Sequence, residues 1–173
     1  MLTITPITPS TPDLSGIESL YLTAFPREER APFAMLLSTA PGNDFLAFRE
    51  GETLRGFCFA VTVGDLTHIL FFAMADGCRD RGFGTQALAL LKERYAGQRL
   101  LADIEDPAEP GSPNPEQRRR RRQFYLRCGF SVSPVRYVWR GTAYEIVVSD
   151  GELTPEEFDH FWDALDQARQ REF

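Results

Sequence analysis

The residues best suited to chemistry lie in one glycine-rich turn, Arg79-Asp80-Arg81-Gly82-Phe83-Gly84-Thr85. An apolar run at residues 69–74 precedes it and an amphipathic segment at residues 86–91 follows it, an order that predicts a strand, a turn and a helix start. The first N–H groups of a helix have no acceptor within the helix, and the helix dipole adds positive charge there. Glycines at alternate positions let a ligand approach the backbone. The turn therefore predicts a cradle for phosphate or pyrophosphate.

Two glycines alone do not identify the ligand. The turn has neither the Gly-x4-Gly-Lys-Ser/Thr pattern of a P-loop nor the three glycines of a dinucleotide-binding fingerprint. A tight strand-to-helix connection that binds nothing is the alternative interpretation. The elements around the turn must therefore decide between the two.

Length, charge and cysteine content restrict the class of protein. The chain has 173 residues, which fits one domain over residues 1–173. Its 25 acidic and 19 basic residues leave a net charge of -6, which argues against a general nucleic-acid binder. Cys58, Cys78 and Cys128 form no CxxC pair and are odd in number, so we expect reduced thiols. The first residues do not resemble a signal peptide, and no apolar run approaches the ~20 residues of a membrane span. We therefore expect a cytoplasmic protein without a membrane partner.

Apolar periodicity, prolines and glycines predict the order of the elements. Strands are expected at residues 2–7, 45–48, 54–63, 67–74, 100–104, 131–139 and 142–148. Helices are expected at residues 14–25 and 33–37, from the turn to about residue 95, and at residues 116–127 and 154–170. The order β-α-α-β-β-β-α-β-α-β-β plus a C-terminal helix predicts an α/β fold, in which helices flank a mixed, largely antiparallel sheet.

Two spaced motifs in this order carry a resemblance. Arg79, Gly82 and Gly84 match an Arg/Gln-x-x-Gly-x-Gly/Ala signature after the fourth strand. Tyr125-Leu126-Arg127-Cys128-Gly129-Phe130 matches a Tyr-x-x-x-Gly-Phe segment between a helix and a strand. With both motifs in place, the sequence resembles the GNAT superfamily of N-acetyltransferases over about residues 2–149. The resemblance implies the GNAT fold, acetyl-CoA as the acyl donor, an amine acceptor and no metal.

The resemblance also implies which residues hold acetyl-CoA. The pyrophosphate is expected on the backbone amides of Arg81, Gly82, Phe83, Gly84 and Thr85. Arg79 would open this loop and add charge, or would simply be a solvated surface arginine. The pantothenate arm is expected to pair with the fourth-strand backbone at Phe72, Ala73 and Met74, whose side chains belong to the core. Asn114 would contact the pantetheine or its sulfur, with the role of a helix N-cap as the alternative.

Attack of an amine on a thioester needs a neutral nucleophile, a polarised carbonyl and a proton for the departing thiolate. The resemblance implies that a backbone N–H near Ala73 or Met74 polarises the carbonyl. Tyr125 matches the tyrosine that commonly protonates the CoA sulfur in the family. A phenol, with an ordinary pKa of about 10, is protonated at neutral pH and can donate to a thiolate. Packing beside the acyl-CoA without donating a proton is the alternative role for Tyr125.

The general base and the acceptor wall are less defined. The strand at residues 67–74 contains no acid, which leaves two candidates for the base. One is His68 near the start of this strand, and the other is Glu105 at the end of the next strand, which would receive the amine proton through water. The alternatives are a structural histidine and a solvated strand end. Glu28 and Glu29, between the first two helices, are candidates for binding a cationic amine, or belong to a charged surface loop. Tyr137 and Tyr144 are further candidates for the acceptor wall.

Two competing functions stay open. The run Arg118-Arg119-Arg120-Arg121-Arg122 suggests an acidic partner such as RNA, but five consecutive residues cover every face of a helix. At least one of them should therefore point inward or toward the phosphates of CoA, and we expect a solvated helix surface. A non-catalytic sensor of acyl-CoA is the other alternative.

The C-terminal helix is expected to pack on this chain's own core. A homodimer is also consistent with the sequence. The identity of the amine is also left open.

Overall fold

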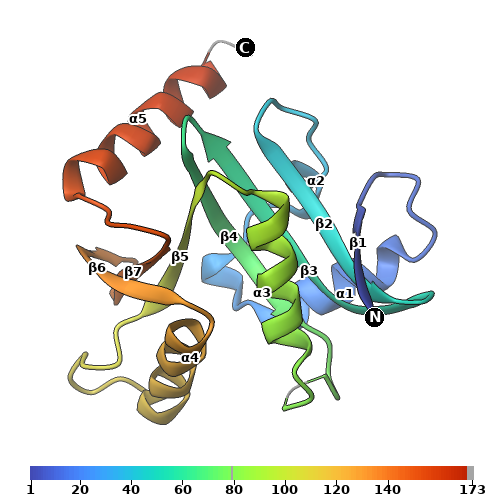
Figure 1. Ribbon diagram of the computed structural model, residues 1–173, viewed down its shortest axis with the longest axis horizontal. Helices are drawn as coiled ribbons and strands as arrows, with labels where there is room; N and C mark the ends of the chain where they lie inside the picture. Colours follow the sequence, from blue (N-terminus) through green and yellow to red (C-terminus); the bar gives the residue numbers. More distant parts are fainter. Residues whose placement is uncertain (79, 171–173) are drawn as a thin grey trace. The chain divides into compact units, whose positions relative to one another are not determined.

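The computed structural model describes residues 1–78 and 80–170, apart from the side chain of Arg169. Arg79, the expected first residue of the phosphate-binding turn, lies outside the described residues. In chain order (Figure 1) the elements are β1 (Leu2–Pro6), α1 (Leu14–Ala24), the short 3-10 helix η1 (Arg27–Glu29), α2 (Phe33–Leu36), β2 (Asn43–Glu50), β3 (Thr53–Val63), β4 (Leu66–Met74), α3 (Phe83–Arg94), β5 (Arg99–Glu105), α4 (Pro115–Arg127), β6 (Phe130–Trp139), β7 (Thr142–Ser149) and α5 (Pro155–Gln170).

The strands form one seven-stranded sheet in the order β1-β2-β3-β4-β5-β7-β6. β2 pairs antiparallel with β1 and β3, and β7 pairs antiparallel with β5 and β6. This arrangement confirms the predicted α/β fold. β2 is longer than predicted because its ladder with β3 continues past the apolar residues, with Asn43 opposite Val61 and Glu50 opposite Thr53. The residues at both ends of β2 are polar, so the apolar pattern that predicted the strand did not include them.

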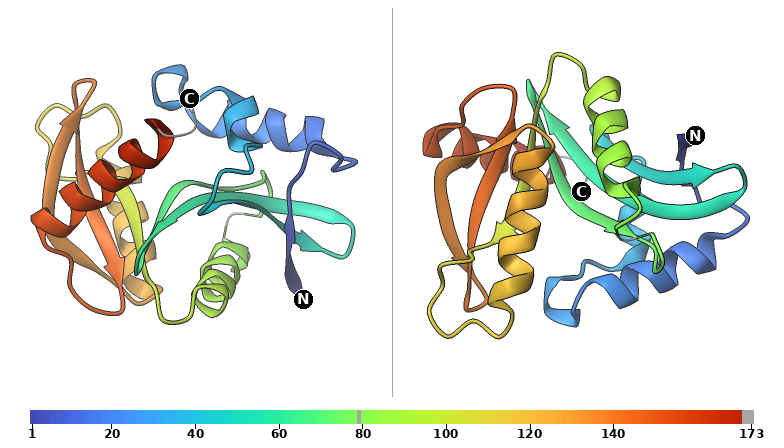
Figure 2. Two further views of the ribbon diagram at one scale, coloured as in Figure 1. Left: turned by 90° about the horizontal axis from the view of Figure 1, so that it is seen from above. Right: turned by 60° about the horizontal axis from the view of Figure 1, so that its bottom comes forward.

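The chain divides into two compact units. The first comprises residues 1–62 and 69–96, and its core is rich in aromatic side chains. Tyr21 of α1 is fully buried and packs edge-on against Phe71 of β4, with ring centroids 5.1 Å apart. The Tyr21 hydroxyl donates a hydrogen bond of 2.8 Å to the carbonyl of Ala31. In this unit, α1 and α2 cover one face of the strands and α3 covers the other (Figure 2).

The second unit comprises residues 63–68 and the chain from residue 97 onward. Its helices α4 and α5 cover opposite faces of β5, β7 and β6 (Figure 2). α5 buries an apolar stripe of Phe158, Phe161 and Leu165, so this helix packs on its own unit. Among the helices described in residues 1–78 and 80–170, none is both long enough and apolar enough to cross a membrane.

α5 begins with a capping box. The Thr154 hydroxyl accepts a hydrogen bond from the N–H of Glu157 (3.2 Å), and the Glu157 carboxylate accepts one from the N–H of Thr154 (2.9 Å). Glu157 also forms an ion pair with Arg99 of β5 at 2.9 Å. The hydrogen bond from Arg99 is the main reason that the pKa of Glu157 lies at about 2, below its ordinary 4.5.

Replacing Glu157 with glutamine should lower the free energy of unfolding by about 1 kcal/mol at neutral pH, since the ion pair is partly exposed to solvent. The folded-state pKa is depressed, so the carboxylate stabilises the fold above pH 4.5, and this contribution is lost as the pH falls toward 2. Urea denaturation of both proteins across this range should show their stabilities converging. Glu156→Gln, at the exposed neighbouring position, is the control. A difference that persists unchanged at low pH would contradict the ion-pair explanation.

Candidate functional site

The glycine-rich turn connects β4 to α3 within the first unit. Gly82 is the N-cap of α3 and has a φ of 77°, in the left-handed region. Asp80 also has a positive φ, of 62°. The N–H of Gln86 donates to the carbonyl of Gly82 (3.1 Å), which closes the first turn of the helix. Because Gly82 has no side chain, the N-cap residue makes no side-chain hydrogen bond to the amides that follow it, and an external anion could bind at this helix start.

Two arginine side chains and one acidic residue, Asp80, lie at this turn. The first turn of α3 contains no acidic residue. The guanidinium groups of Arg81 and Arg55 lie over the ring of Phe83, 5.3 and 5.1 Å from its centroid. Arg55 is in turn held by Glu50 at 2.7 Å. Sequence reasoning missed Arg55 because it lies in β3, far along the chain and outside any motif.

The part of β4 that is expected to hold the pantothenate arm packs closely against Gly56 of β3. A Cβ atom at Gly56 would lie 2.5 Å from the Ala73 carbonyl oxygen and 2.8 Å from the sulfur of Met74. Glycine is therefore required at this position for β3 and β4 to pair. Ala73 is buried, whereas Phe72 and Met74 are half-buried, consistent with their side chains belonging to the core.

Tyr125 lies on α4 in the second unit and is 6% exposed. Its ring contacts Phe124 and Phe130 edge-on, at centroid distances of 5.4 and 5.3 Å. α4 ends two residues later, where Gly129 adopts a φ of 85° and its N–H donates to Leu126. The segment from Tyr125 to Phe130 is thus the predicted passage from helix to strand.

Arg118 organises the start of α4. It is 2% exposed, and its Nη2 donates to the Glu105 carboxylate at 2.8 Å. Arg118 also forms an ion pair with Glu109, which lowers the pKa of that carboxyl, and its Nε donates to the side chain of Asn114 at 2.8 Å. It is therefore the arginine of the run that points inward, as the helix geometry requires.

The other four arginines of the run also have acidic partners. Arg119 and Arg120 pair with Glu116, Arg121 pairs with Glu105, and Arg122 lies 3.3 Å from the buried carboxylate of Glu145. These ion pairs reduce the positive charge of the helix surface. The basic run is therefore explained within the second unit and gives little support to a nucleic-acid partner.

Asn114 and Glu105 differ from their simplest expected roles. Asn114 is the N-cap residue of α4, but its side chain caps no backbone N–H; it bonds Arg118 and Gln117 instead. Glu105 accepts from Arg118 and, at 3.2 Å, from Arg121. Both Glu105 oxygens therefore anchor α4 to β5, which favours a structural role over that of a general base.

His68 is fully buried. Its Nε2 lies 2.7 Å from Asp103 of β5, and its ring contacts the α5 aromatics Phe158, Phe161 and Trp162 at centroid distances of 5.5 to 5.9 Å. Nδ1 has no hydrogen-bond partner among the described residues. A histidine enclosed in this way favours the structural alternative. The partner Asp103 was missed, although a single acid within the apolar strand Leu100-Leu101-Ala102-Asp103-Ile104 is a usable signal.

The acceptor candidates belong to different units of the chain. Glu28 and Glu29 belong to η1 in the first unit, where Glu28 is exposed and Glu29 is half-buried. In the second unit, the β6–β7 hairpin stacks Tyr137 on Tyr144, with centroids 5.3 Å apart and planes 15° apart. The structure thus brings the two tyrosines together and places the two glutamates in one short helix.

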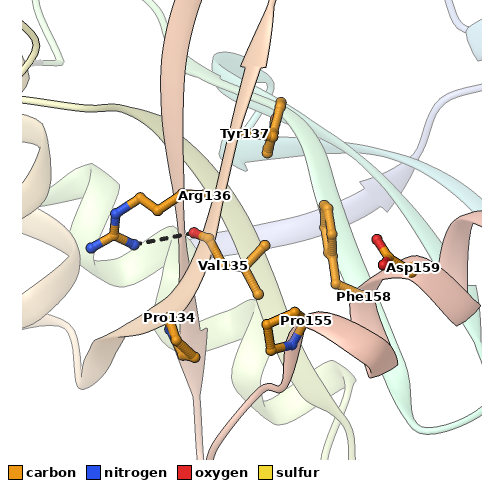
Figure 3. A pocket seen from close by; sticks show the side chains of 7 residues that line it. All are labelled: Pro134, Val135, Arg136, Tyr137, Pro155, Phe158 and Asp159. Atoms are coloured by element: carbon orange, nitrogen blue, oxygen red, sulfur yellow. Dashed lines mark hydrogen bonds between the residues drawn. The ribbon is translucent and has the colours of Figure 1, made fainter.

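A surface depression of about 270 Å³ lies between β6 and the start of α5 in the second unit (Figure 3). Phe158 stacks on Tyr137 within it, at 6.0 Å and 23°. Sequence reasoning identified Tyr137 but not this depression. The residues that line it are Pro134, Val135, Arg136, Tyr137, Pro155, Phe158 and Asp159.

Comparison with known proteins gives a consistent result. The sequence model of the Acetyltransferase (GNAT) family matches residues 14–130. A search of curated proteins gives no significant match. A solved structure from Bacteroides thetaiotaomicron, assigned to the GNAT family, is similar with a TM-score of 0.75 at 21% identity, covering 97% of this chain and 94% of that chain.

Two further solved structures are similar in fold. An aminoglycoside 6'-N-acetyltransferase complexed with coenzyme A has a TM-score of 0.66 at 15% identity, covering 85% of this chain and 96% of that chain. The ribosomal-protein-S18-alanine N-acetyltransferase from Escherichia coli has a TM-score of 0.63 at 18% identity, covering 90% of this chain and 97% of that chain.

Proposed function

Because the chain belongs to the acetyltransferase (GNAT) family, we propose that it transfers an acetyl group from acetyl-CoA to a primary amine by direct attack in a ternary complex. The observation that carries the proposal is the turn between β4 and α3. Left-handed Gly82 starts a helix that has no acid in its first turn, with Arg81 and Arg55 beside it. This arrangement fits a pyrophosphate.

The roles that we propose for the chain's own residues are those implied by its resemblance to the family. The amides from Arg81 to Thr85 bind the pyrophosphate, and the β4 backbone at Phe72, Ala73 and Met74 binds the pantothenate arm. Acetyl-CoA supplies an activated acyl carbon as a thioester. Tyr125 donates its phenolic proton to the departing sulfur. Since His68 and Glu105 both have structural partners, we propose that the amine proton leaves to water rather than directly to a side chain.

The fold does not indicate which amine is the acceptor. The two similar acetyltransferases described above are named for an aminoglycoside and for an alanine of a ribosomal protein, which are unrelated acceptors. A primary amine is the group that such acceptors share. Glu28 and Glu29 are proposed to attract its positive charge.

The proposal is tested by measuring acetyl-CoA binding calorimetrically and the release of the CoA thiol with a panel of amines. We expect binding, and thiol release that depends on one class of amine. No binding at high micromolar acetyl-CoA would contradict the assignment. Binding without turnover for any amine would favour the alternative of a non-catalytic acyl-CoA sensor.

Replacing Gly82 with alanine should weaken acetyl-CoA binding about tenfold, because the added Cβ disfavours the left-handed backbone that aims the amides. Gly97→Ala is a matched control: Gly97 has a φ of 85° and, like Gly82, has no heavy atom within 4 Å of the added Cβ. Both substitutions should cost about 1 kcal/mol of stability. Equal acetyl-CoA affinities of the two variants would show that the turn does not hold the donor.

A further inference from the structure

The depression between β6 and α5 is lined mainly by apolar side chains, and its charged lining residues are Arg136 and Asp159. Tyr144, Tyr137 and Phe158 form a stacked column, and Pro134, Val135 and Pro155 complete the apolar lining. The ring of Phe158 also contacts the ring of His68, which forms a hydrogen bond with Asp103. The position of Phe158 in the lining is therefore stabilised by a buried, hydrogen-bonded histidine. A volume of about 270 Å³ accommodates a short alkyl chain or a small ring.

The two charged residues of the lining do not contribute equally. Arg136 forms an ion pair with the buried Glu145 at 3.2 Å and donates hydrogen bonds to the carbonyls of Ser133 and Val135. Figure 3 shows its side chain extending away from Tyr137, Phe158 and Asp159. Asp159 is exposed and lies at the other side of the depression. The charge offered to a ligand is therefore negative.

The acidic character continues along α5. Glu156, Asp159, Asp163 and Asp166 are all exposed and are spaced three, four and three residues apart, which places them on one side of the helix. The whole chain also carries a net charge of -6. The long-range field at α5 therefore attracts cations toward the depression.

We propose that this depression binds a cationic, amphipathic amine, whose ammonium group pairs with Asp159 and whose alkyl or ring portion lies on Tyr137, Phe158 and the prolines. The lining residues all belong to the second unit, so the binding site can be tested without acetyl-CoA.

Binding is tested by titrating the full chain with diaminopentane and, separately, with pentylamine, following the chemical shifts of β6 and α5 by NMR. We expect both amines to shift the signals of Tyr137 and Phe158, since each has an ammonium group and an alkyl chain. Asp159→Asn should weaken this binding about fivefold, by removal of one partly exposed ion pair. Asp163→Asn, which removes the same charge one turn along the exposed side, should change it less than twofold. Equal effects of the two variants, or no shifts at Tyr137 and Phe158, would overturn the site.

The titration separates this inference from the proposed function. No binding of either amine at the depression, in an enzyme that still acetylates amines, would overturn the inference and leave the function standing. Absence of acetyl transfer to every amine would contradict the proposed function, while the NMR titration would still decide whether the depression binds a cationic amine.

Discussion

Replacing Tyr125 with phenylalanine should lower kcat about a hundredfold, because the departing CoA thiolate would lose its proton donor. Phenylalanine keeps the ring that packs on Phe124 and Phe130. Steady-state kinetics at saturating acetyl-CoA, with thiol release as the readout, measure the effect. KM for acetyl-CoA should stay within about twofold, since the pyrophosphate cradle is untouched.

Tyr95→Phe is the matched control for Tyr125→Phe. Its hydroxyl donates to Asp44 at 2.6 Å in the first unit, so its loss should cost about 1 kcal/mol of stability without changing kcat. If Tyr125→Phe retained the kcat of the unaltered protein, the ring would serve only for packing. The proton would then reach the sulfur from water or from another group.

Replacing Arg118 with methionine should lower the free energy of unfolding by about 3 kcal/mol, because Glu105 and Glu109 would lose the guanidinium that neutralises them. A loss of this size is a large part of the stability of an ordinary domain. Urea denaturation followed by circular dichroism measures it. Activity should fall as well, since Arg118 also holds Asn114 and the start of the helix that carries Tyr125.

Arg120→Met is the control for Arg118→Met, since it makes the same chemical change two residues away. The side chain of Arg120 is 79% exposed and lies 3.8 Å from Glu116, so its replacement should change stability by less than about 0.5 kcal/mol. Similar stabilities of the two variants would mean that the ion pairs around Arg118 cost as much in desolvation as they return.

Much of the local structure could be predicted from the sequence because it depends on neighbouring residues. The capping box at Thr154 and Glu157 and the helix end at Gly129 use residues within one turn of each other. The start of α3 at Gly82 follows from the glycine-rich turn in the same way. The strand and helix order then led to the α/β fold, since apolar periodicity reports which face each element buries.

The candidate site was harder to predict because it depends on pairing between distant residues. His68 and Glu105 both had residue types suited to a general base. In the structure, His68 pairs with Asp103, 35 residues away, and Glu105 pairs with Arg118, 13 residues away. No local pattern reports such partners, because the register of the strands and the packing of α4 bring them together.

By itself, the sequence determined the family, the order of the elements and the turn proposed to hold the acyl donor, because these depend on short-range geometry and on spaced motifs. Only the tertiary structure decided which arginine of residues 118–122 is buried, since consecutive helical residues differ only in what packs against them. It alone revealed the depression beside Asp159, because Tyr137 and Phe158 are far apart in sequence and meet only when α5 packs on β6.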